Sequence, residues 1–371
     1  MAPTQAALYE ELGDLHLSWS EAELPERERT KHVHRLHPYL GKYVPQLVEA
    51  LLERYVRSGG RVLDPFAGSG TTLVQSLEAG RDAVGVDVAA FNCLLMGVKT
   101  ARYDPFVLET ELRDAASRLG RSGERPSGYV REWFAPQSAA ELLHFRSLLG
   151  EYEHADVLRV VLARAARSAR LTTHFDLEFP KTPKREPYWC HKHRRTCKPV
   201  GEANKFLSRY LVDTLERLKA FQRVRSRTHA ATILHGDARD VGLDGTFDAV
   251  VTSPPYPGLI DYHEQHRYAY ELLGLDDRRE REIGAAVRGT SRAALEAYVE
   301  GISSVLARCA EALSPGAPVI VVVNDRRDLY GEILSRARLR PVDRLERHVN
   351  RRTGRRSGEY FESILVSVQE T

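Results

Sequence analysis

The sequence predicts an α/β fold in which a mostly parallel, twisted sheet carries helices on both faces and a mainly helical insertion interrupts it. The chain contains short, β-branched apolar runs that do not alternate with polar residues, as expected for strands buried on both faces. Helical patterns separate several of these runs, which indicates parallel strands joined by crossover helices. A long interval after the second run has helical periodicity and no comparable strand signal.

The predicted strands end at polar residues or prolines. The first run ends at Asp-Pro, the second ends at an acid, and the fourth ends at two consecutive prolines, which cannot continue a strand ladder. The six predicted strands lie within residues 61–66, 82–88, 231–237, 247–255, 317–325 and 362–368.

Helical patterns flank these strands at residues 44–56, 71–80 and 294–313. Between Tyr103 and Thr228 four more amphipathic patterns follow one another. We therefore expect residues 1–103 and 231–371 to form the two parts of one sheet domain, and residues 104–230 to form the helical insertion.

The composition favours a protein with a substantial core. The chain has 371 residues, of which 42% are hydrophobic. No run approaches the roughly 18 apolar residues of a membrane span, and the amino terminus has no signal-peptide pattern, so we expect a soluble, cytoplasmic protein. The four cysteines do not suggest a disulfide scaffold.

The net charge of +3 conceals two basic blocks. Residues 181–227 hold 14 Lys and Arg against 4 Asp and Glu, and residues 336–356 hold 9 against 2. Charge alone favours contact with nucleic acid over a solvated face with scattered arginines.

A glycine-rich loop, LDPFAGSGTT, joins the first strand to a helix. Gly68 and Gly70 allow a sharp turn and a close approach of a ligand to the backbone. The loop lacks the lysine of a P-loop, and Leu73 stands where a dinucleotide fingerprint has its third glycine. The loop is therefore poorly suited to pyrophosphate.

Two acids narrow the choice of ligand. Asp87 ends the second strand, where a carboxylate can accept hydrogen bonds from ribose hydroxyls. Asp64 lies beside the loop, where it would attract an ammonium group and repel a phosphate. A ribose and an ammonium without phosphate describe S-adenosyl-L-methionine; the alternative is a purely structural strand–turn–helix with capping residues.

These motifs resemble a known family. DPFAGSGTT, the GVD that ends the second strand, and TSPPY (Thr252–Tyr256) together resemble the class I S-adenosylmethionine-dependent amino-methyltransferases that modify DNA bases. His37–Leu52 resembles the segment beside the methionine end of the cofactor, and His235–Asp240 resembles the segment whose acid lies near the adenine. The resemblance implies a Rossmann-like class I methyltransferase fold. Its implied cofactor-binding residues are Tyr39, Lys42, Asp64, Phe66, Gly68, Gly70, Thr71, Asp87 and Asp237.

The TSPPY turn suits methyl transfer to an exocyclic amine, whose lone pair is delocalised into the base. Hydrogen-bond acceptors aimed at the amine hydrogens would localise that lone pair, and the Pro254 carbonyl and the Ser253 hydroxyl are such acceptors. Tyr256 would stack on a base flipped out of the duplex. We therefore expect Ser253, Pro254, Pro255 and Tyr256 to be catalytic; a rigid surface turn is the alternative.

The first residue of the motif bears on the target base. Family members that act on adenine N6 usually carry Asp or Asn there, and those that act on cytosine N4 usually carry Ser. Ser253 therefore favours a site-specific DNA (cytosine-N4) methyltransferase. The alternatives are an adenine-N6 DNA methyltransferase, an RNA amino-methyltransferase and a non-catalytic DNA-binding subunit. We expect double-stranded DNA as partner, with association to the nucleoid, and a cognate restriction endonuclease is a further candidate partner.

The insertion is the predicted target-recognition region. Its stretch Lys181–Pro199 combines cations with aromatic residues, a composition suited to phosphate and base-edge contacts. The candidate DNA-binding residues are Lys181, Lys184, Arg185, Tyr188, Trp189, Lys192, Arg194 and Arg195.

The same stretch contains CHKHRRTC. Cys190, Cys197 and either His191 or His193 offer three metal ligands, whereas zinc sites usually have four, and His174 is a distant candidate for the fourth. We expect no metal site and favour a basic DNA-contact loop with two incidental cysteines.

Overall fold

The computed structural model describes residues 17–20, 22–126, 128–174, 180–349 and 360–370. A seven-stranded sheet forms its centre, with strand order β5-β2-β1-β6-β7-β9-β8. The strands of this sheet are β1 (Arg61–Asp64), β2 (Asp82–Asp87), β5 (Ala231–His235), β6 (Ala249–Thr252), β7 (Pro318–Val323), β8 (Leu339–His348) and β9 (Phe361–Gln369).

The predicted α/β fold is confirmed. The first five strands in this order pair in parallel, and β9 pairs antiparallel with both β7 and β8. All six predicted strands form. The edge strand β8 was not predicted, because half of its side chains are charged and only Leu339 and Arg347 are buried.

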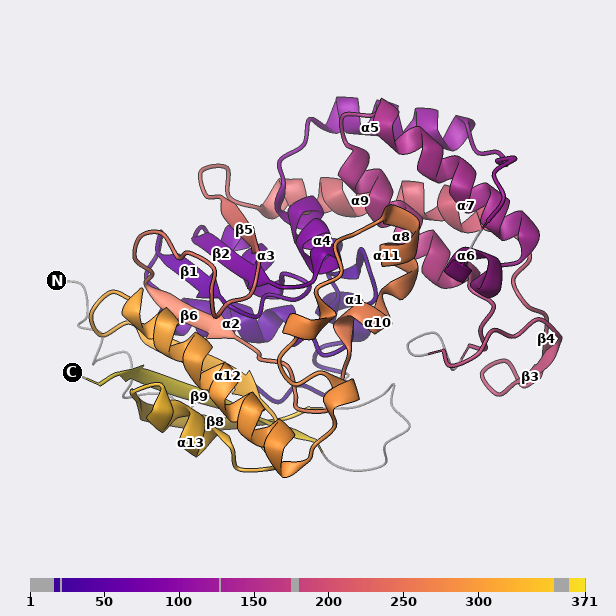
Figure 1. The fold of residues 1–371 in the computed structure, drawn as a ribbon. Helices are drawn as coiled ribbons and strands as arrows, with labels where there is room; N and C mark the ends of the chain where they lie inside the picture. Colours follow the sequence, from indigo (N-terminus) through magenta and orange to yellow (C-terminus); the bar gives the residue numbers. More distant parts are fainter. Residues whose placement is uncertain (1–16, 21, 127, 175–179, 350–359, 371) are drawn as a thin grey trace.

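Helices cover both faces of the sheet (Figure 1). On one face α2 packs on Val62, Val251 and Ile320, with α3 beside it. On the other face α12 and α13 pack on Val250, Val319 and other strand residues. Successive residues of β1, β6 and β7 thus enter opposite cores, which is why these strands read as continuous apolar runs.

Helices predicted from periodicity form close to the expected positions, and others form where no prediction was made. The first group comprises α2 (Pro45–Tyr55), α3 (Thr71–Glu78), α5 (Pro105–Ser117), α7 (Pro136–Leu148), α8 (Ala155–Ala169), α9 (Asn204–Val224) and α12 (Arg292–Glu311). The second group comprises α1 (Glu26–Arg29), α4 (Ala90–Thr100), α6 (Gly128–Trp133), α10 (Tyr262–Gln265), α11 (Arg267–Leu273) and α13 (Tyr330–Arg336).

The helices between β2 and β5 form a second layer beside the sheet (Figure 1). Helices α4 to α9 share one apolar core, and α11, which follows the TSPPY turn, joins it through Tyr268 and Leu272. A two-stranded hairpin of β3 (Tyr188–Cys190) and β4 (Arg195–Cys197) projects from this layer. This hairpin was not predicted. In the described part of the chain, no helix combines the length and apolar character needed to cross a membrane.

Candidate active site

The carboxyl ends of β5, β2, β1 and β6 meet at one edge of the sheet. In the sheet, β2 and β5 lie on one side of β1, and β6 lies on its other side. The strand order therefore reverses here, and this edge contains the topological switch point where ligands of open α/β sheets bind. A pocket that is partly open to solvent lies there, and the empty space within it and its open mouth amounts to about 790 Å³. Nine of the predicted site residues line it: Tyr39, Lys42, Phe66, Gly68, Thr71, Asp87, Asp237, Ser253 and Pro255.

The glycine loop forms one wall, and its two glycines have different tasks. Gly68 has φ +51°, and a Cβ there would lie 2.9 Å from the Tyr39 hydroxyl oxygen, so the site requires a residue without a side chain. Gly70 has φ +76°, and a Cβ there would lie 2.8 Å from Met96 Cγ. Gly70 therefore lets α3 pack against α4 and does not line the pocket, in contrast to its predicted role.

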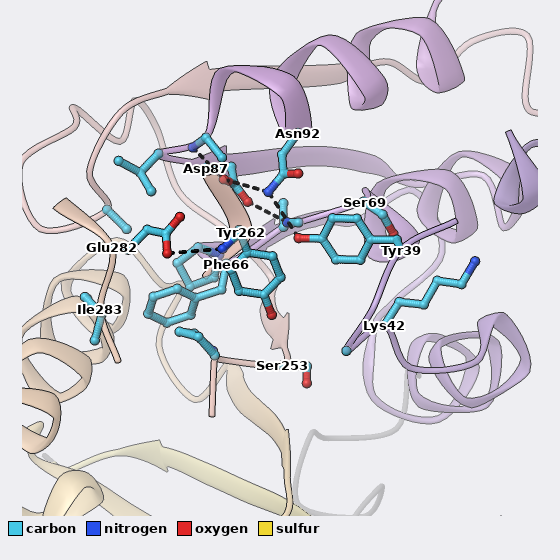
Figure 2. Close-up of a pocket in the computed structure, with 18 of the residues that line it drawn as sticks. Tyr39, Lys42, Phe66, Ser69, Asp87, Asn92, Ser253, Tyr262, Glu282 and Ile283 are labelled. Atoms are coloured by element: carbon cyan, nitrogen blue, oxygen red, sulfur yellow. Dashed lines mark hydrogen bonds between the residues drawn. The ribbon is translucent and has the colours of Figure 1, made fainter. Parts of the chain in front are cut away.

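Asp87 joins the end of β2 to the loop. Its carboxylate accepts hydrogen bonds from the backbone N–H groups of Gly68 and Ala89, each at 2.8 Å, and from the Asn92 side-chain amide at 3.1 Å. Burial raises the pKa of Asp87 to about 6, although these hydrogen bonds oppose the shift. The carboxylate is thus held in a fixed orientation at the pocket wall (Figure 2).

Asp64 differs from its predicted role, because it lies beneath the pocket and not in its wall. Its two oxygens accept hydrogen bonds from the hydroxyls of Thr72 and Thr252, both at 2.6 Å, and one accepts the Phe66 N–H at 3.1 Å. Burial raises its pKa to about 6. Asp64 therefore ties the end of β1 to the start of α3 and the end of β6, and it cannot face an ammonium group from there.

The third acid, Asp237, follows β5. Its carboxylate forms an ion pair with Arg239 at 2.6 Å and lies 3.7 Å from the Arg281 guanidinium. Burial would raise the pKa of Asp237, but the hydrogen bonds and charges of these arginines outweigh burial and lower it. Asp237 is therefore ionised at neutral pH at the pocket wall.

The segment before α2 closes the opposite side. The Tyr39 ring stacks at 5.6 Å on both Tyr262 and His266, and its hydroxyl accepts a hydrogen bond from Asn92 at 3.1 Å. The Lys42 ammonium donates to the His34 carbonyl at 2.8 Å, and burial lowers its pKa to about 8. Lys42 thus lines the end of the pocket away from Asp87, with its ammonium directed to the His34 carbonyl (Figure 2).

The TSPPY turn is braced from both sides. Thr252 donates to Asp64, and the Tyr298 hydroxyl of α12 donates to the Pro255 carbonyl at 2.9 Å. Ser253 and Pro255 line the pocket, whereas Pro254 is buried and does not. Tyr256 packs half-buried against the α12 core and lies outside the pocket wall, so its predicted stacking face is not part of this cavity.

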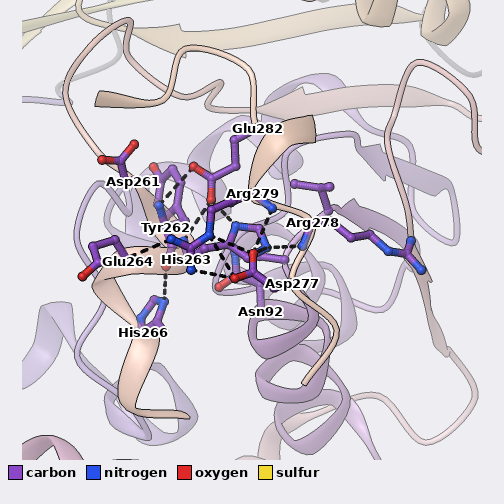
Figure 3. A network of polar contacts seen from close by, with 12 residues as sticks. Asn92, Asp261, Tyr262, His263, Glu264, His266, Asp277, Arg278, Arg279 and Glu282 are labelled. Atoms are coloured by element: carbon purple, nitrogen blue, oxygen red, sulfur yellow. Dashed lines mark hydrogen bonds and ion pairs between the residues drawn. The ribbon is translucent and has the colours of Figure 1, made fainter. Parts of the chain in front are cut away.

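A polar network behind the pocket positions residues that the sequence did not single out (Figure 3). Glu282 accepts the backbone N–H groups of Tyr262 and His263 at 3.2 and 2.9 Å. The Arg278 N–H donates to His263 Nε2 at 3.2 Å, so His263 Nδ1 carries the proton that it donates to Glu282. The network fixes Tyr262, Glu282 and Ile283 in the pocket wall.

These residues and Asn92 were missed because their segments carry no recognised motif. The one available signal was the density of polar and aromatic residues after TSPPY, in DYHEQHRYAY.

The candidate DNA-binding residues lie on or near the β3–β4 hairpin, and none of them lines the pocket. Tyr188 is half-buried and the other seven are exposed, Trp189 with 57% of its surface accessible. The structure therefore separates the predicted cofactor residues from the predicted DNA residues.

The pocket residues fit S-adenosyl-L-methionine. Asp87 would accept the ribose hydroxyls, and the apolar faces of Phe66 and Ile283 would hold the adenine ring between them (Figure 2). Lys42 would attract the carboxylate of the methionine moiety, and Gly68 leaves room for the ligand against the loop. No phosphate-binding lysine follows the loop, in agreement with a ligand that carries no phosphate.

Comparisons with known proteins agree with this site. A protein-family profile described as DNA methylase matches residues 8–95, which include the glycine loop. The chain is 33% identical to Type II methyltransferase M.MjaII of Methanocaldococcus jannaschii, over 96% of this chain and 84% of that protein. It is 21% identical to Type II methyltransferase M.BsoBI of Geobacillus stearothermophilus, over 70% of this chain and 56% of that protein.

Among solved structures, TrmN from Thermus thermophilus aligns at 14% identity and a TM-score of 0.36, over 89% of this chain and 50% of that chain. The family follows from the sequence relatives and the profile. The chain belongs to the S-adenosyl-L-methionine-dependent class I DNA methyltransferases of the N4/N6 type.

Proposed function

We propose that this DNA methyltransferase acts on the exocyclic N4 amine of cytosine, in a base flipped out of the duplex. The observation that carries the proposal is Ser253, which occupies the first position of the SPPY motif and lines the pocket. Its hydroxyl has no hydrogen-bond partner among the described residues, so it is available to a substrate. A hydroxyl both donates and accepts, which suits the amine and the neighbouring ring nitrogen of cytosine.

The neighbouring carbonyls support the same role. The Pro255 carbonyl already accepts the Tyr298 hydroxyl, whereas the Pro254 carbonyl accepts no hydrogen bond from a described residue. The Pro254 oxygen is therefore the unbonded one of the two, although Pro254 is buried and its neighbours Ser253 and Pro255 form the pocket wall. The brace from Tyr298 fixes the turn before substrate arrives, so little reorganisation is needed at the moment of transfer.

The residues of the chain would act by positioning. S-adenosyl-L-methionine supplies an electrophilic methyl group, and Asp87 and Lys42 would hold its two ends. Ser253 and the Pro254 carbonyl would accept the amine hydrogens and localise the nitrogen lone pair in line with that methyl. The hydrogen bonds between Glu282 and His263 hold the segments that contribute Tyr262, Glu282 and Ile283 to the pocket wall.

A nucleoside analysis tests the target base. The purified chain is incubated with unmethylated genomic DNA and methyl-labelled S-adenosyl-L-methionine, and the digested nucleosides are separated by mass spectrometry. We expect label in N4-methylcytosine, and its loss in Ser253→Ala. Label in N6-methyladenine would refute the assignment of the base, and label in RNA alone would refute the assignment of the polymer.

We propose that residues 104–230 recognise the target site, with the β3–β4 hairpin as a DNA contact. Its cations are exposed, and Trp189 offers an aromatic face among them. Reversing Lys192 and Arg194 to Glu should weaken DNA binding and flatten its salt dependence. Arg27→Glu is the control, because Arg27 is exposed on α1 and lies outside both basic blocks and outside the insertion. Equal salt slopes in all three proteins would refute this contact.

We further propose that the chain is the modification enzyme of a restriction–modification system. The printed names of its relatives, Type II methyltransferases, support this role. DNA methylated by the chain should resist a nuclease that cleaves the same site, and cleavage at the unmodified rate would refute the proposal.

A further inference from the structure

Three potential metal ligands meet beside the turn of the β3–β4 hairpin, and a fourth lies next to one of them. The ligand atoms of His174, Cys190 and His193 all lie within 4.8 Å of one another. Cys197 lies outside this group of three, and its sulfur is 3.3 Å from His193 Nδ1. The rings of His174 and His193 meet edge to face at 4.5 Å. Residues separated in the sequence are thus brought to one point, which sequence spacing alone did not establish.

Ordinary packing does not account for this arrangement. Each strand of the hairpin has three residues, and a short two-stranded hairpin has little stability of its own. The residues around the cysteines are mostly exposed and charged, yet Cys190 is fully buried and Cys197 is 9% exposed. Both thiols are free, so no disulfide closes the hairpin. Among the described residues, neither cysteine belongs to an apolar core cluster; the Cys190 sulfur lies within 4.8 Å of ligand atoms of both histidines, and Cys197 lies beside His193.

We propose that His174, Cys190, His193 and Cys197 bind one structural Zn²⁺ in tetrahedral geometry. Two thiolates and two imidazoles are a preferred zinc donor set, and ligand atoms about 2.0–2.3 Å from a tetrahedral ion lie roughly 3.3–3.8 Å apart. A contraction of about 1 Å brings the three clustered ligand atoms to that separation.

The charge of the ligands and the hydrogen bond that the His174 ring makes with Tyr188 are also consistent with Zn²⁺. Two thiolates balance the charge of Zn²⁺, so the centre is neutral among the surrounding lysines and arginines. The Tyr188 hydroxyl lies 3.3 Å from His174 Nδ1, which leaves Nε2 as the ligand atom of that ring. Partners of this kind orient metal-bound histidines.

The ion would fasten the hairpin to the segment that follows α8, because His174 belongs to that segment and the other three ligands belong to the hairpin. It would thereby hold Trp189 and the neighbouring cations in one orientation. This consequence for DNA rests on the proposed DNA contact, whereas the metal site itself does not.

Metal analysis tests the site without DNA. The full chain is purified without a polyhistidine tag, and its zinc content is measured by plasma mass spectrometry. We expect about one zinc per chain in the wild type. We expect most of it to be lost in Cys197→Ser and in His193→Ala. His191→Ala, in the same hairpin but outside the cluster, and Cys309→Ala, in the α12 core, should retain it.

Cobalt substitution provides a second readout that does not depend on activity. Co²⁺ in the site should give the visible bands of a tetrahedral ion and thiolate charge-transfer absorption, both absent in Cys197→Ser. Binding of S-adenosyl-L-methionine should be unchanged in Cys197→Ser, which shows that the variant is folded and separates this test from the methyl-transfer proposal. A wild-type chain without zinc that gives no tetrahedral cobalt spectrum would overturn the proposal, as would a Cys190–Cys197 disulfide in the protein purified without reductant.

Discussion

Cofactor affinity should fall in acid because of Asp87. Burial raises its pKa to about 6 in the free protein, so the carboxyl becomes neutral as the pH falls below that value. Ribose hydroxyls donate strong hydrogen bonds only to the charged form. The affinity that depends on this contact is therefore fully present above about pH 6 and is lost as the pH falls through it.

The size of the effect follows from proton linkage. If the bound ribose stabilises the carboxylate and lowers its pKa well below 5, the dissociation constant rises about tenfold for each pH unit below 6. The affinity at pH 5 should then be about tenfold weaker than at pH 7, equivalent to about 1.4 kcal/mol.

Isothermal titration of S-adenosyl-L-methionine between pH 5 and pH 7.5 measures this dependence, and Asp87→Asn is its control. Asp64 also titrates at about 6, so the acid dependence that remains in Asp87→Asn measures the contribution of Asp64 and of any other group. Identical pH profiles in the wild type and in Asp87→Asn would refute the assigned role of Asp87. A cofactor affinity that increases as the pH falls would refute the predicted direction of the pH dependence.

Three substitutions test the other parts of the site. Ser253→Ala should lower kcat by about 100-fold, because the lost hydroxyl acts on the target amine, and the dissociation constant of the cofactor should stay within about twofold. A fall in cofactor affinity as large as the fall in kcat would place Ser253 in the cofactor site. Tyr298→Phe removes the donor to the Pro255 carbonyl, so thermal unfolding should show a loss of about 1 kcal/mol and single-turnover kinetics a slower transfer step. Gly68→Ala should weaken cofactor binding strongly, because φ is +51° and the new Cβ would meet a tyrosine hydroxyl at 2.9 Å, whereas Gly242→Ala, with open space around it, should bind normally.

Local sequence patterns predicted much of the sheet and part of the site. The six predicted strands form because their residues are apolar on both faces, a property that the sequence displays directly. Asp87 and Ser253 reach the pocket because the carboxyl ends of parallel strands meet at one edge, whatever the loops between them do. The edge strand β8 was missed because charged side chains hide its pattern, and its pairing depends on β9.

Other features depended on contacts between distant segments. The sequence suggested that Asp64 faces a ligand, but hydroxyls from α3 and β6 occupy both of its oxygens. Glu282 reaches the pocket wall only because His263 and the backbone of α10 hold it there. No local pattern reports such partners, since they are set by how the chain returns to the same place.

By itself, the sequence of this protein determined the alternation of strands and helices, the glycine loop without a phosphate lysine, and the SPPY turn at a strand end. These features are local, because backbone conformation and residue chemistry act over a few neighbouring positions. Only the tertiary structure decided which proline carbonyl remains available, since Tyr298 lies on a helix more than forty residues away in the chain. It alone also brought His174 to Cys190 and His193, because a metal site is defined by distances in space and not by spacing along the chain.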